Sequence, residues 1–550
     1  MGLLFPLLRD CQPADSLTAV SGVRYRWPKV RGKCAASLTN EVIMKRKSVS
    51  IENLSRRRFL LTTIAAATVF PSLTFAQSRS RVVVAHGVGI YSLNPYAVNT
   101  SPLVAAWASL MEPLIEADYE KRGYRGMLAE SWQMKGTRIE FKLRKGVRFH
   151  DGTPFTSKDV AASFKRIMTD KQSLQAPNLE NVKDTEAPDD FTFIVTLKKA
   201  DASALEDING RVIMKQSVAE KMGEADNKPI GTGPFKFTSW ERSGQFVIRR
   251  NENYWGQPAK IDEVIYKSIQ EDAARIAALE AGQVDIISNI PPHEVTRLKA
   301  NPRLRIQQVQ GLRPLFLVLS PAYKPLDNVK VRRAISHAID RERIIKHILE
   351  GNAYPLNGLL SPQVFGYDPG AKAFPYDPEK AKQLLVEAGF PNGVEFDYYS
   401  PTGRYPKDKE VALVIVEQLS RVGIKANLKT PEWAIFNTDY KNGKYPMYLT
   451  GRGSLTDADA LFQQYFRTGV TRRTLGYSNP KLDEILELEQ QTFDSKKREK
   501  LLQDAHRLIL DDAPAIPLWN AMDIYAHRAD LIWTAPPDEK VQLKQANYKR

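Results

Sequence analysis

Two different spacings of hydrophobic residues divide the chain into two parts. In the first part, a short apolar run at 81–86 predicts a strand, and apolar residues at every second position predict half-buried strands over 139–143 and 191–197. From about residue 328 the helical spacing takes over, beginning with one apolar stripe over 331–348. The first part is therefore expected to be rich in strands and the second in helices.

Predicted helices and strands alternate along the second part. In order, they are a helix over 377–389, a strand over 394–400, a helix over 407–422, a strand over 424–428, a helical stretch over 480–512 and a strand over 515–519. Connections of helix length between strands are typical of a mainly parallel sheet with helices on both faces. The pattern therefore predicts an α/β fold.

The first 76 residues have the pattern of an export signal. The basic sequence SRRRFL (55–60) leads into an apolar run, and PSLTFA (71–76) ends on a small residue, which predicts cleavage after Ala76. The apolar run is too short to cross a bilayer, which needs about 20 residues. The order Ser-Arg-Arg-x-Phe-Leu resembles a twin-arginine signal, with an ordinary Sec leader as the alternative. Met44 opens a more typical leader and is our candidate for the true start.

Removal of residues 1–76 would change both the charge and the thiol content. These residues carry 12 Lys and Arg against 4 Asp and Glu, so half of the formal charge of +16 would leave with them. No dense basic stripe remains, and we expect no nucleic-acid partner. Both cysteines, Cys11 and Cys34, lie in the removed part. A soluble periplasmic protein without disulfides, cysteine–metal sites or a lipid anchor is therefore expected.

His150 and Asp151 stand side by side in RFHDGTPFTSKDV (148–160), where a catalytic pair is conceivable. However, Asp-Gly is a turn pair, and Thr156 with Asp159 has the spacing of a capping box at a helix start. We therefore interpret this stretch as structural. The seven histidines show no His-x-x-x-His pattern, and the chain has no Gly-x-Ser-x-Gly or phosphate loop. Neither an enzyme nor a metal or cofactor is expected.

Several motifs in a fixed order resemble one protein family, the solute-binding proteins of dipeptide, oligopeptide and nickel ABC importers (family 5). The motifs are MLAESW (127–132) with FKLRKGVRFHDGTPF (141–155), GTGPF (231–235) with NENYW (251–255), VRRAISHAID (331–340), and YDPEKA (376–381) with EAGF (387–390). The resemblance implies a two-lobed periplasmic binding protein of type II, in the large peptide-binding class, with mixed sheets and a two-strand hinge.

The resemblance also implies how the chain is divided between the lobes. Residues 77–316 and the returning segment 513–550 would form lobe I, and residues 317–512 would form lobe II. Such a protein closes on a solute and presents it to permease subunits in the inner membrane, and we expect it to act as a monomer. A ligand-sensing adaptor, a periplasmic chaperone on the same fold and a nickel-type binder of metal chelates remain as alternatives.

The ligand site is expected between the lobes, beyond the carboxyl ends of strands. Three loops fit this position, namely 87–95, 401–405 and 451–457. The candidate ligand-binding residues are Tyr91, Asn94, Tyr399, Arg404, Tyr405, Trp433, Arg452, Ser454, Trp519 and Asn520. For the three aromatic residues Tyr399, Trp433 and Trp519, a place in the core is the alternative.

By the resemblance, Arg404 matches an arginine that holds the ligand carboxylate in dipeptide binders. A guanidinium suits a carboxylate because two parallel N–H bonds fix its plane. The loop at 451–459 departs from the peptide binders, since Ser454 or Leu455 replaces the aspartate that pairs with a free ammonium, although Asp457 could substitute. We therefore expect a polar or anionic solute, for example an N-blocked peptide, a glutathione-like tripeptide, an opine, a sugar conjugate or a metal chelate.

Overall fold

The computed structural model describes residues 81–90, 92–97, 101–221, 229–241, 244–453, 455–469 and 472–549, all within the compact unit Phe75–Arg550. The predicted export signal lies outside the described residues. No described helix is long and apolar enough to cross a membrane.

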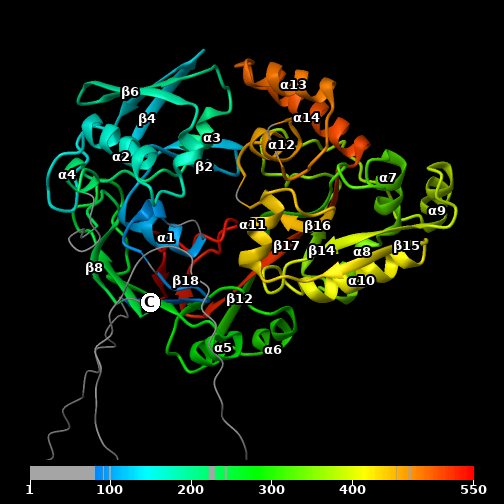
Figure 1. The fold of residues 1–550 in the computed structure, drawn as a ribbon. Coiled ribbons are helices and arrows are strands. Elements are labelled where there is room, and N and C mark those ends of the chain that lie inside the picture. The colour runs from blue at the N-terminus through cyan, green and yellow to red at the C-terminus, as the bar shows by residue number, and fades with distance from the viewer. Residues whose placement is uncertain are drawn as a thin grey trace, which may run out of the picture. The chain divides into compact units, whose positions relative to one another are not determined.

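One long mixed sheet runs through the described chain (Figure 1). In spatial order, its strands are β15 (Ile424–Lys429), β14 (Val394–Tyr399), β16 (Met447–Gly451), β12 (Leu304–Leu319), β17 (Ala515–Arg528), β11 (Ile286–Ile287), β1 (Arg81–His86), β10 (Glu263–Ser268), β9 (Gln245–Arg250) and β8 (Phe235–Trp240), and β13 (Ala353–Pro355) pairs with β17. The pairs β14–β15, β14–β16, β1–β10 and β1–β11 are parallel, whereas β12 is antiparallel to both β16 and β17. The predicted parallel arrangement therefore holds for the outer strands of the second part but not for its inner ones.

Two long strands, β12 and β17, connect the two halves of this sheet. The half with β1 and β8–β11 is called the first lobe here, and the half with β14–β16 the second lobe. Residues 304–310 of β12 pair with 522–528 of β17 in the first lobe, and residues 315–318 pair with 515–519 in the second. The register shifts between Gln310 and Pro314. An irregularity of this kind bends a strand, and it lies where the chain crosses between the lobes, as a two-strand hinge requires.

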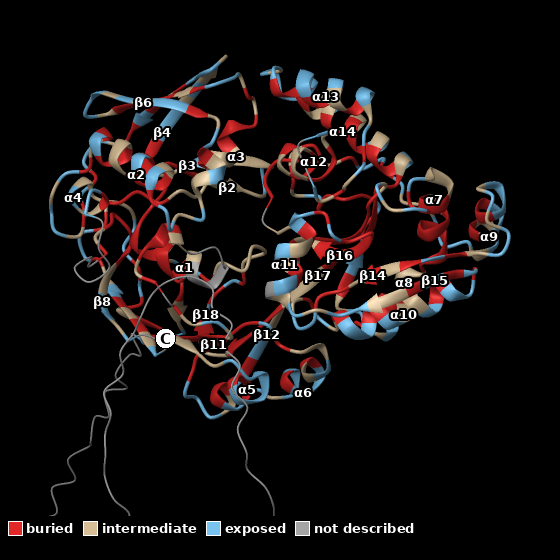
Figure 2. Ribbon diagram, viewed as in Figure 1, coloured by how far each residue is buried: buried red, intermediate tan, exposed pale blue. Residues whose placement is uncertain are grey.

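Side-chain alternation along β12 explains why helices cover both faces of the second lobe. Leu315, Leu317 and Leu319 point into one core, with α7–α10, whereas Phe316 and Val318 point into another, with α11, α12 and α14. The helices are α7 (Val329–Ala338), α8 (Arg341–His347), α9 (Pro378–Glu387), α10 (Asp408–Ser420), α11 (Trp433–Lys441), α12 (Asp459–Phe466), α13 (Pro480–Gln490) and α14 (Ser495–Asp512). Figure 2 shows buried residues along the strands and exposed ones on the outer sides of α9 and α10.

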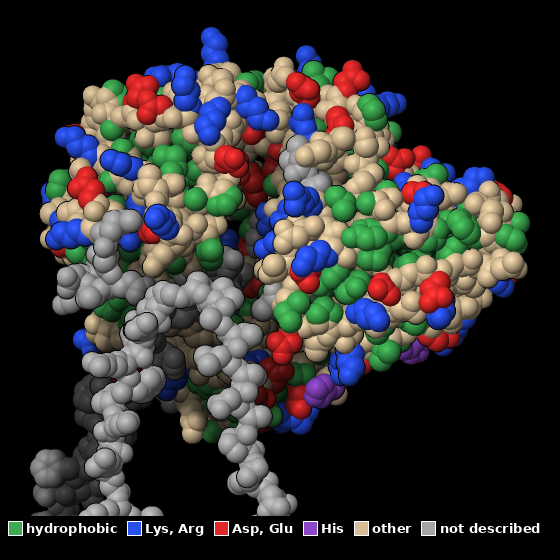
Figure 3. Space-filling view, in the orientation of Figure 1, with side chains coloured by type: hydrophobic (Ala, Val, Ile, Leu, Met, Phe, Trp, Pro, Cys, Tyr) green, Lys and Arg blue, Asp and Glu red, His purple; other side chains and the backbone are tan. Residues whose placement is uncertain are grey.

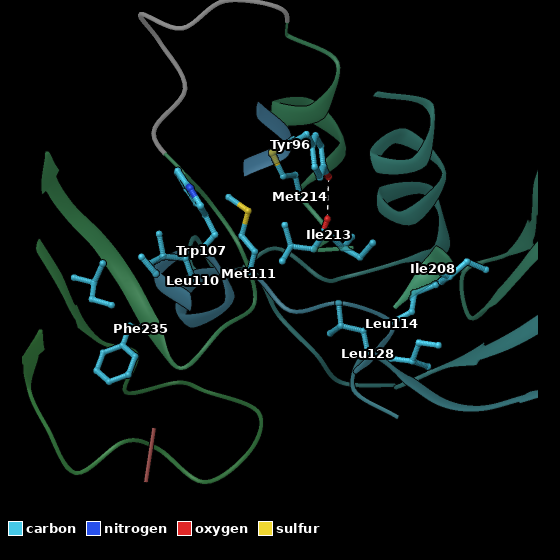
Figure 4. Close-up of a cluster of buried hydrophobic side chains, with 14 of the residues drawn as sticks. Tyr96, Trp107, Leu110, Met111, Leu114, Leu128, Ile208, Ile213, Met214 and Phe235 are labelled. Atoms are coloured by element: carbon cyan, nitrogen blue, oxygen red, sulfur yellow. Dashed lines mark hydrogen bonds between the residues drawn. The ribbon is translucent and has the colours of Figure 1, made fainter. Parts of the chain in front are cut away.

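In the first lobe, a second, smaller sheet lies above the lobe's part of the long sheet. Its shorter elements are α1 (Ser101–Leu110), β2 (Ile115–Asp118), β3 (Gly123–Gly126), α2 (Ser157–Thr169), α3 (Ala204–Ile208), α4 (Gln216–Ala219), α5 (Asp272–Glu280), α6 (Val295–Lys299), β18 (Leu531–Ile532) and β19 (Asn547–Tyr548). The smaller sheet has the order β4 (Ala129–Lys135), β5 (Arg138–Leu143), β7 (Thr192–Leu197) and β6 (Val182–Asp189). Both sheets share one core with α1 and α2, part of which Figure 4 shows around Trp107 and Met111.

The RFHDGTPFTSKDV stretch is a structural junction, as the sequence predicts. The Asp159 carboxylate accepts the Thr156 backbone N–H at 2.8 Å and completes the capping box of α2. His150 accepts the N–H of Gly231 on Nδ1 at 3.3 Å and lies 3.1 Å from the Gly233 carbonyl through Nε2. Asp151 binds Lys215 at 2.6 Å. Both side chains are therefore occupied by contacts that hold the lobe together.

Candidate functional site

The structure brings two of the three predicted loops together. Because β14 and β16 are parallel neighbours, the loops that follow them leave the same edge of the sheet. The Gly451 backbone N–H donates to the Tyr405 hydroxyl at 2.9 Å and fastens one loop to the other. Figure 3 shows a crevice between the two lobes, with Lys and Arg side chains along the wall on the side of α11.

Arg404 lies on an aromatic platform in this region. The centre of its guanidinium is 5.0 Å from the Trp433 ring centroid and 5.2 Å from that of Tyr405. No described carboxylate forms an ion pair with it. Burial and the neighbouring Arg313 lower the pKa of Arg404. An arginine held over ring faces, without a counter-ion from the described chain, is suited to an anionic group of a ligand.

Asp408 positions the Arg404 loop, and the sequence analysis missed it. Its carboxylate accepts the backbone N–H groups of Gly403, Arg404 and Tyr405 at 3.2, 2.8 and 3.1 Å. Gly403 has a positive φ of 73°, which glycine adopts without strain. The available signal was an acidic residue in the first turn of a predicted helix, directly after a glycine-containing loop.

Arg452 is a second arginine without an ion pair among the described residues. Its backbone N–H donates to the Pro314 carbonyl at 3.2 Å, at the bend of β12, and its Nε is buried without a hydrogen-bond partner. Its charge contributes to lowering the pKa of Lys441, behind burial and Arg473. The 451–453 loop therefore adds positive charge to the same wall as Arg404.

Arg313, at the bend of β12, is a further arginine that the sequence analysis missed. Its guanidinium binds both oxygens of Glu539 at 2.9 and 2.8 Å. A Cβ on Gly453 would lie 3.0 Å from Arg313 Nε, so the glycine lets the two segments approach. Glu539 is thus bound to Arg313, and among the described residues neither Arg404 nor Arg452 forms an ion pair.

Asp457 is not available to bind a ligand ammonium. Its two oxygens accept from Arg498 at 2.6 and 2.9 Å in a buried ion pair, and one of them also accepts the Asp459 N–H at 3.0 Å. Asp457 thus contacts the backbone of the first residue of α12, whose N-cap is Ala458. The hydroxyl of the neighbouring Thr456 accepts from the Asn209 amide at 3.4 Å.

Three candidate residues belong to the protein interior instead of the crevice wall. Asn94 donates to Asp170 at 3.0 Å and accepts from the Tyr96 N–H at 3.0 Å. Trp519 is packed into the second-lobe core, and Asn520 is fully buried and donates to Ser361 at 2.7 Å. Their side chains are enclosed by protein, as the alternative core role of Trp519 predicts, and their role in ligand binding stays a prediction.

Of the three remaining candidates, the structure describes only Tyr399. Tyr399 stacks face to face on Tyr445, with ring centroids 3.9 Å apart. It is partly exposed and is the last residue of β14, the strand that leads to Arg404. Tyr91 and Ser454 lie outside the described residues. In the described part of the chain, no group of three or more His, Cys, Asp or Glu is arranged to hold a metal ion.

Comparisons with known proteins agree with this architecture. The family described as bacterial extracellular solute-binding proteins, family 5 Middle, matches residues 123–472. Heme-binding protein A of Haemophilus influenzae is 30% identical over 71% of this chain and 78% of its own, and the glutathione-binding protein GsiB of Escherichia coli K12 is 29% identical over 83% and 92%. The periplasmic binding protein DppA of Helicobacter pylori, solved with the peptide STSA, superposes with a TM-score of 0.72 at 27% identity, covering 86% of this chain and 98% of its own.

Proposed function

The chain belongs to the bacterial extracellular solute-binding proteins, family 5, and we propose that it captures a small solute with a carboxylate group and delivers it to an ABC importer permease. The proposed ligand class rests on the surroundings of the Arg404 guanidinium. This guanidinium is held over Trp433 and Tyr405 without an ion pair from the described chain. A carboxylate there would gain two charge-assisted hydrogen bonds.

The solute does not need a free α-ammonium group. Two described acids near this wall are paired within the protein, Asp457 with Arg498 and Glu539 with Arg313. An ammonium placed there would compete with these ion pairs. This supports an N-blocked or modified peptide, a glutathione-like tripeptide, an opine, a sugar conjugate or a metal chelate bound through its carboxylates.

A thermal-shift screen of these classes tests the proposal. A ligand present at about 100 times its Kd stabilises the protein by ~2.7 kcal/mol. We expect Arg404→Gln to weaken binding of the best ligand about 30- to 100-fold, which corresponds to the ~2–3 kcal/mol of a charge-assisted hydrogen bond. The control is Arg421→Gln, since Arg421 pairs with Glu417 on an exposed helix surface.

Pairs of free and N-acetylated peptides test the second part of the proposal. We expect acetylation to leave the affinity unchanged within about threefold. Tight binding of plain dipeptides that acetylation abolishes would contradict the ligand class, and so would an unchanged affinity in Arg404→Gln. No stabilisation by any member of the screen would contradict the receptor function.

We further propose that residues 1–76 direct export by the twin-arginine route and are removed without leaving a lipid anchor. The twin arginine in SRRRFL (55–60) and the placement of both cysteines before residue 77 support this. The division into lobes at about 316 and 513, and action as a monomer beside the permease, complete the proposal.

A further inference from the structure

The two lobes touch each other away from the hinge, through α3 and the segments around α12 and α13. The Ala202 N–H donates to the Gln490 carbonyl at 2.7 Å, and the Asn209 amide to the Thr456 hydroxyl at 3.4 Å. We call this contact the clasp. Its members are Lys199, Asp201, Ala202, Ser203, Glu206 and Asn209 of the first lobe and Thr456, Asp459 and Gln490 of the second.

One hydroxyl at the centre of the clasp faces two carboxyl groups. Ser203 Oγ lies 2.6 Å from Asp201 Oδ1, within its own lobe, and 2.8 Å from Asp459 Oδ2, across the interface. A serine hydroxyl has a single hydrogen to donate. Both hydrogen bonds therefore form together only when one of the two carboxyl groups carries a proton that it donates to Ser203 Oγ.

The charges around this hydroxyl also favour a proton on one of the two carboxyl groups. The charged and titratable groups that face it are Lys199, Glu206, Asp207 and Arg211 from the first lobe and Arg452, Asp457, Glu489 and Arg498 from the second. The charge of Arg498 is already matched by Asp457, its bidentate partner. Burial and the charge of Asp459 raise the pKa of Asp201, while burial and Asp457 raise that of Glu206.

We propose that this clasp holds the lobes closed and that it takes up a proton each time it forms, so that closure is favoured as the pH falls. In the open protein, Ser203 donates to Asp201 and Asp459 is free of the first lobe. When the lobes meet, Asp459 reaches a hydroxyl whose hydrogen is already used, and a proton from solvent completes the second bond. The inference rests on the proposed function only in that the lobes open and close.

Distance measurement between spin labels tests this in the full chain. Cys11 and Cys34 are replaced by Ser, and labels are attached at Lys183→Cys and Lys500→Cys, two exposed positions on different lobes. Double electron–electron resonance then gives the ratio of closed to open molecules between pH 5.5 and 8, with circular dichroism to verify folding. For one coupled proton, we expect this ratio to rise up to tenfold for each unit by which the pH falls.

Asp459→Asn is the decisive variant, because an amide can donate to Ser203 Oγ without taking up a proton. We expect the slope of its closed-to-open ratio against pH to be smaller than that of wild type by the equivalent of about one proton. If Asp459→Asn does not fold, Asp201→Asn replaces it in the test, because it removes the other carboxyl group. It should likewise reduce the dependence of the closed-to-open ratio on pH. The matched control is Glu499→Gln, which removes an interlobe ion pair with Arg122 at 3.0 Å. It should lower the ratio at every pH and keep the slope.

The outcomes separate this inference from the proposed function. A wild-type protein that opens and closes without a pH slope would overturn the inference and leave the receptor function standing. The same slope in Asp459→Asn as in wild type would overturn it too. A single, fixed distance at every pH and with every ligand would contradict both.

Discussion

At the scale of single residues, several family motifs keep the backbone in place instead of contacting a ligand. Gly231 and Gly233 of the GTGPF motif pack against the end of α1. A Cβ on Gly231 would lie 2.2 Å from the Leu110 carbonyl oxygen, and one on Gly233 would lie 2.6 Å from that of Ser109. The atoms in the way are backbone, which cannot rotate aside. Glycine is therefore required for packing at both positions.

We expect Gly231→Ala to lower the free energy of unfolding by about 2 kcal/mol, within the range of overpacked cores. Urea denaturation of the purified protein measures it. Gly123→Ala is the matched control, because the nearest atom to its added Cβ is 4.0 Å away. That change should stay within about 0.5 kcal/mol of wild type. Equal effects of the two substitutions would mean that the close approach to Leu110 is not what requires glycine.

At the scale of elements, the spacing of hydrophobic residues predicted which segments are helices or strands better than it predicted where one helix ends and the next begins. The apolar stripe over 331–348 is two helices, α7 and α8, because Asp340 ends the first and caps the second by accepting the Arg343 N–H at 2.9 Å. The helical stretch 480–512 likewise divides into α13 and α14. In both cases the capping aspartate was visible in the sequence, but the continuous apolar spacing concealed the break.

A buried ion-pair group fastens α14 to α13 and to the loop before α12. Arg498 binds Asp457 through both terminal nitrogens and Glu489 through Nε at 2.9 Å. Removing the arginine would leave Asp457 without its counter-charge in the interior, which costs about 3–5 kcal/mol. We expect Arg498→Met to lower the free energy of unfolding by this amount, measured by urea denaturation.

An exposed ion pair on α10 provides the control for this prediction. Arg421 and Glu417 are spaced by one helical turn, and both are substantially exposed to solvent. Such pairs contribute about 0.3–0.5 kcal/mol, so Arg421→Met should change stability by no more than that. If Arg498→Met were as mild as Arg421→Met, the buried group would not be fastening these elements.

At the scale of the whole molecule, ordered motifs identified the fold, whereas contacts between distant segments had to come from the structure. The place of Arg404 and Tyr405 beside the 451–453 loop was predictable, because loops that follow parallel strands leave the same edge of a sheet. Asn94 and Trp519 were also candidates, yet their side chains turn inward, which local spacing does not encode. The Ser203–Asp459 contact joins residues 256 positions apart, and no sequence pattern relates them.

Buried histidines in three regions make global stability depend on pH. Burial lowers the pKa of His86, His150 and His506 to about 4. His506 also accepts the Leu359 N–H on Nε2 at 2.9 Å, a bond that protonation of this nitrogen would remove. In the unfolded chain each histidine titrates near its ordinary value of about 6.5, so between about pH 6.5 and 4 the unfolded state binds more protons. The stability that these three histidines contribute therefore falls as the pH falls through this window.

Together these three groups should contribute a fall of up to ~4 kcal/mol per pH unit to the free energy of unfolding in the middle of the window, since each proton contributes about 1.4 kcal/mol. Urea denaturation at pH 7, 6 and 5 measures this slope. His506→Gln removes one of the three groups and should change the slope by up to about 1.4 kcal/mol per pH unit. A glutamine oxygen can still accept the Leu359 N–H. His293→Gln, at an exposed position, should leave it unchanged. The same slope in His506→Gln as in wild type would mean that the imidazole of His506 binds a proton as readily in the folded protein as in the unfolded chain, which contradicts its enclosure by the packed structure.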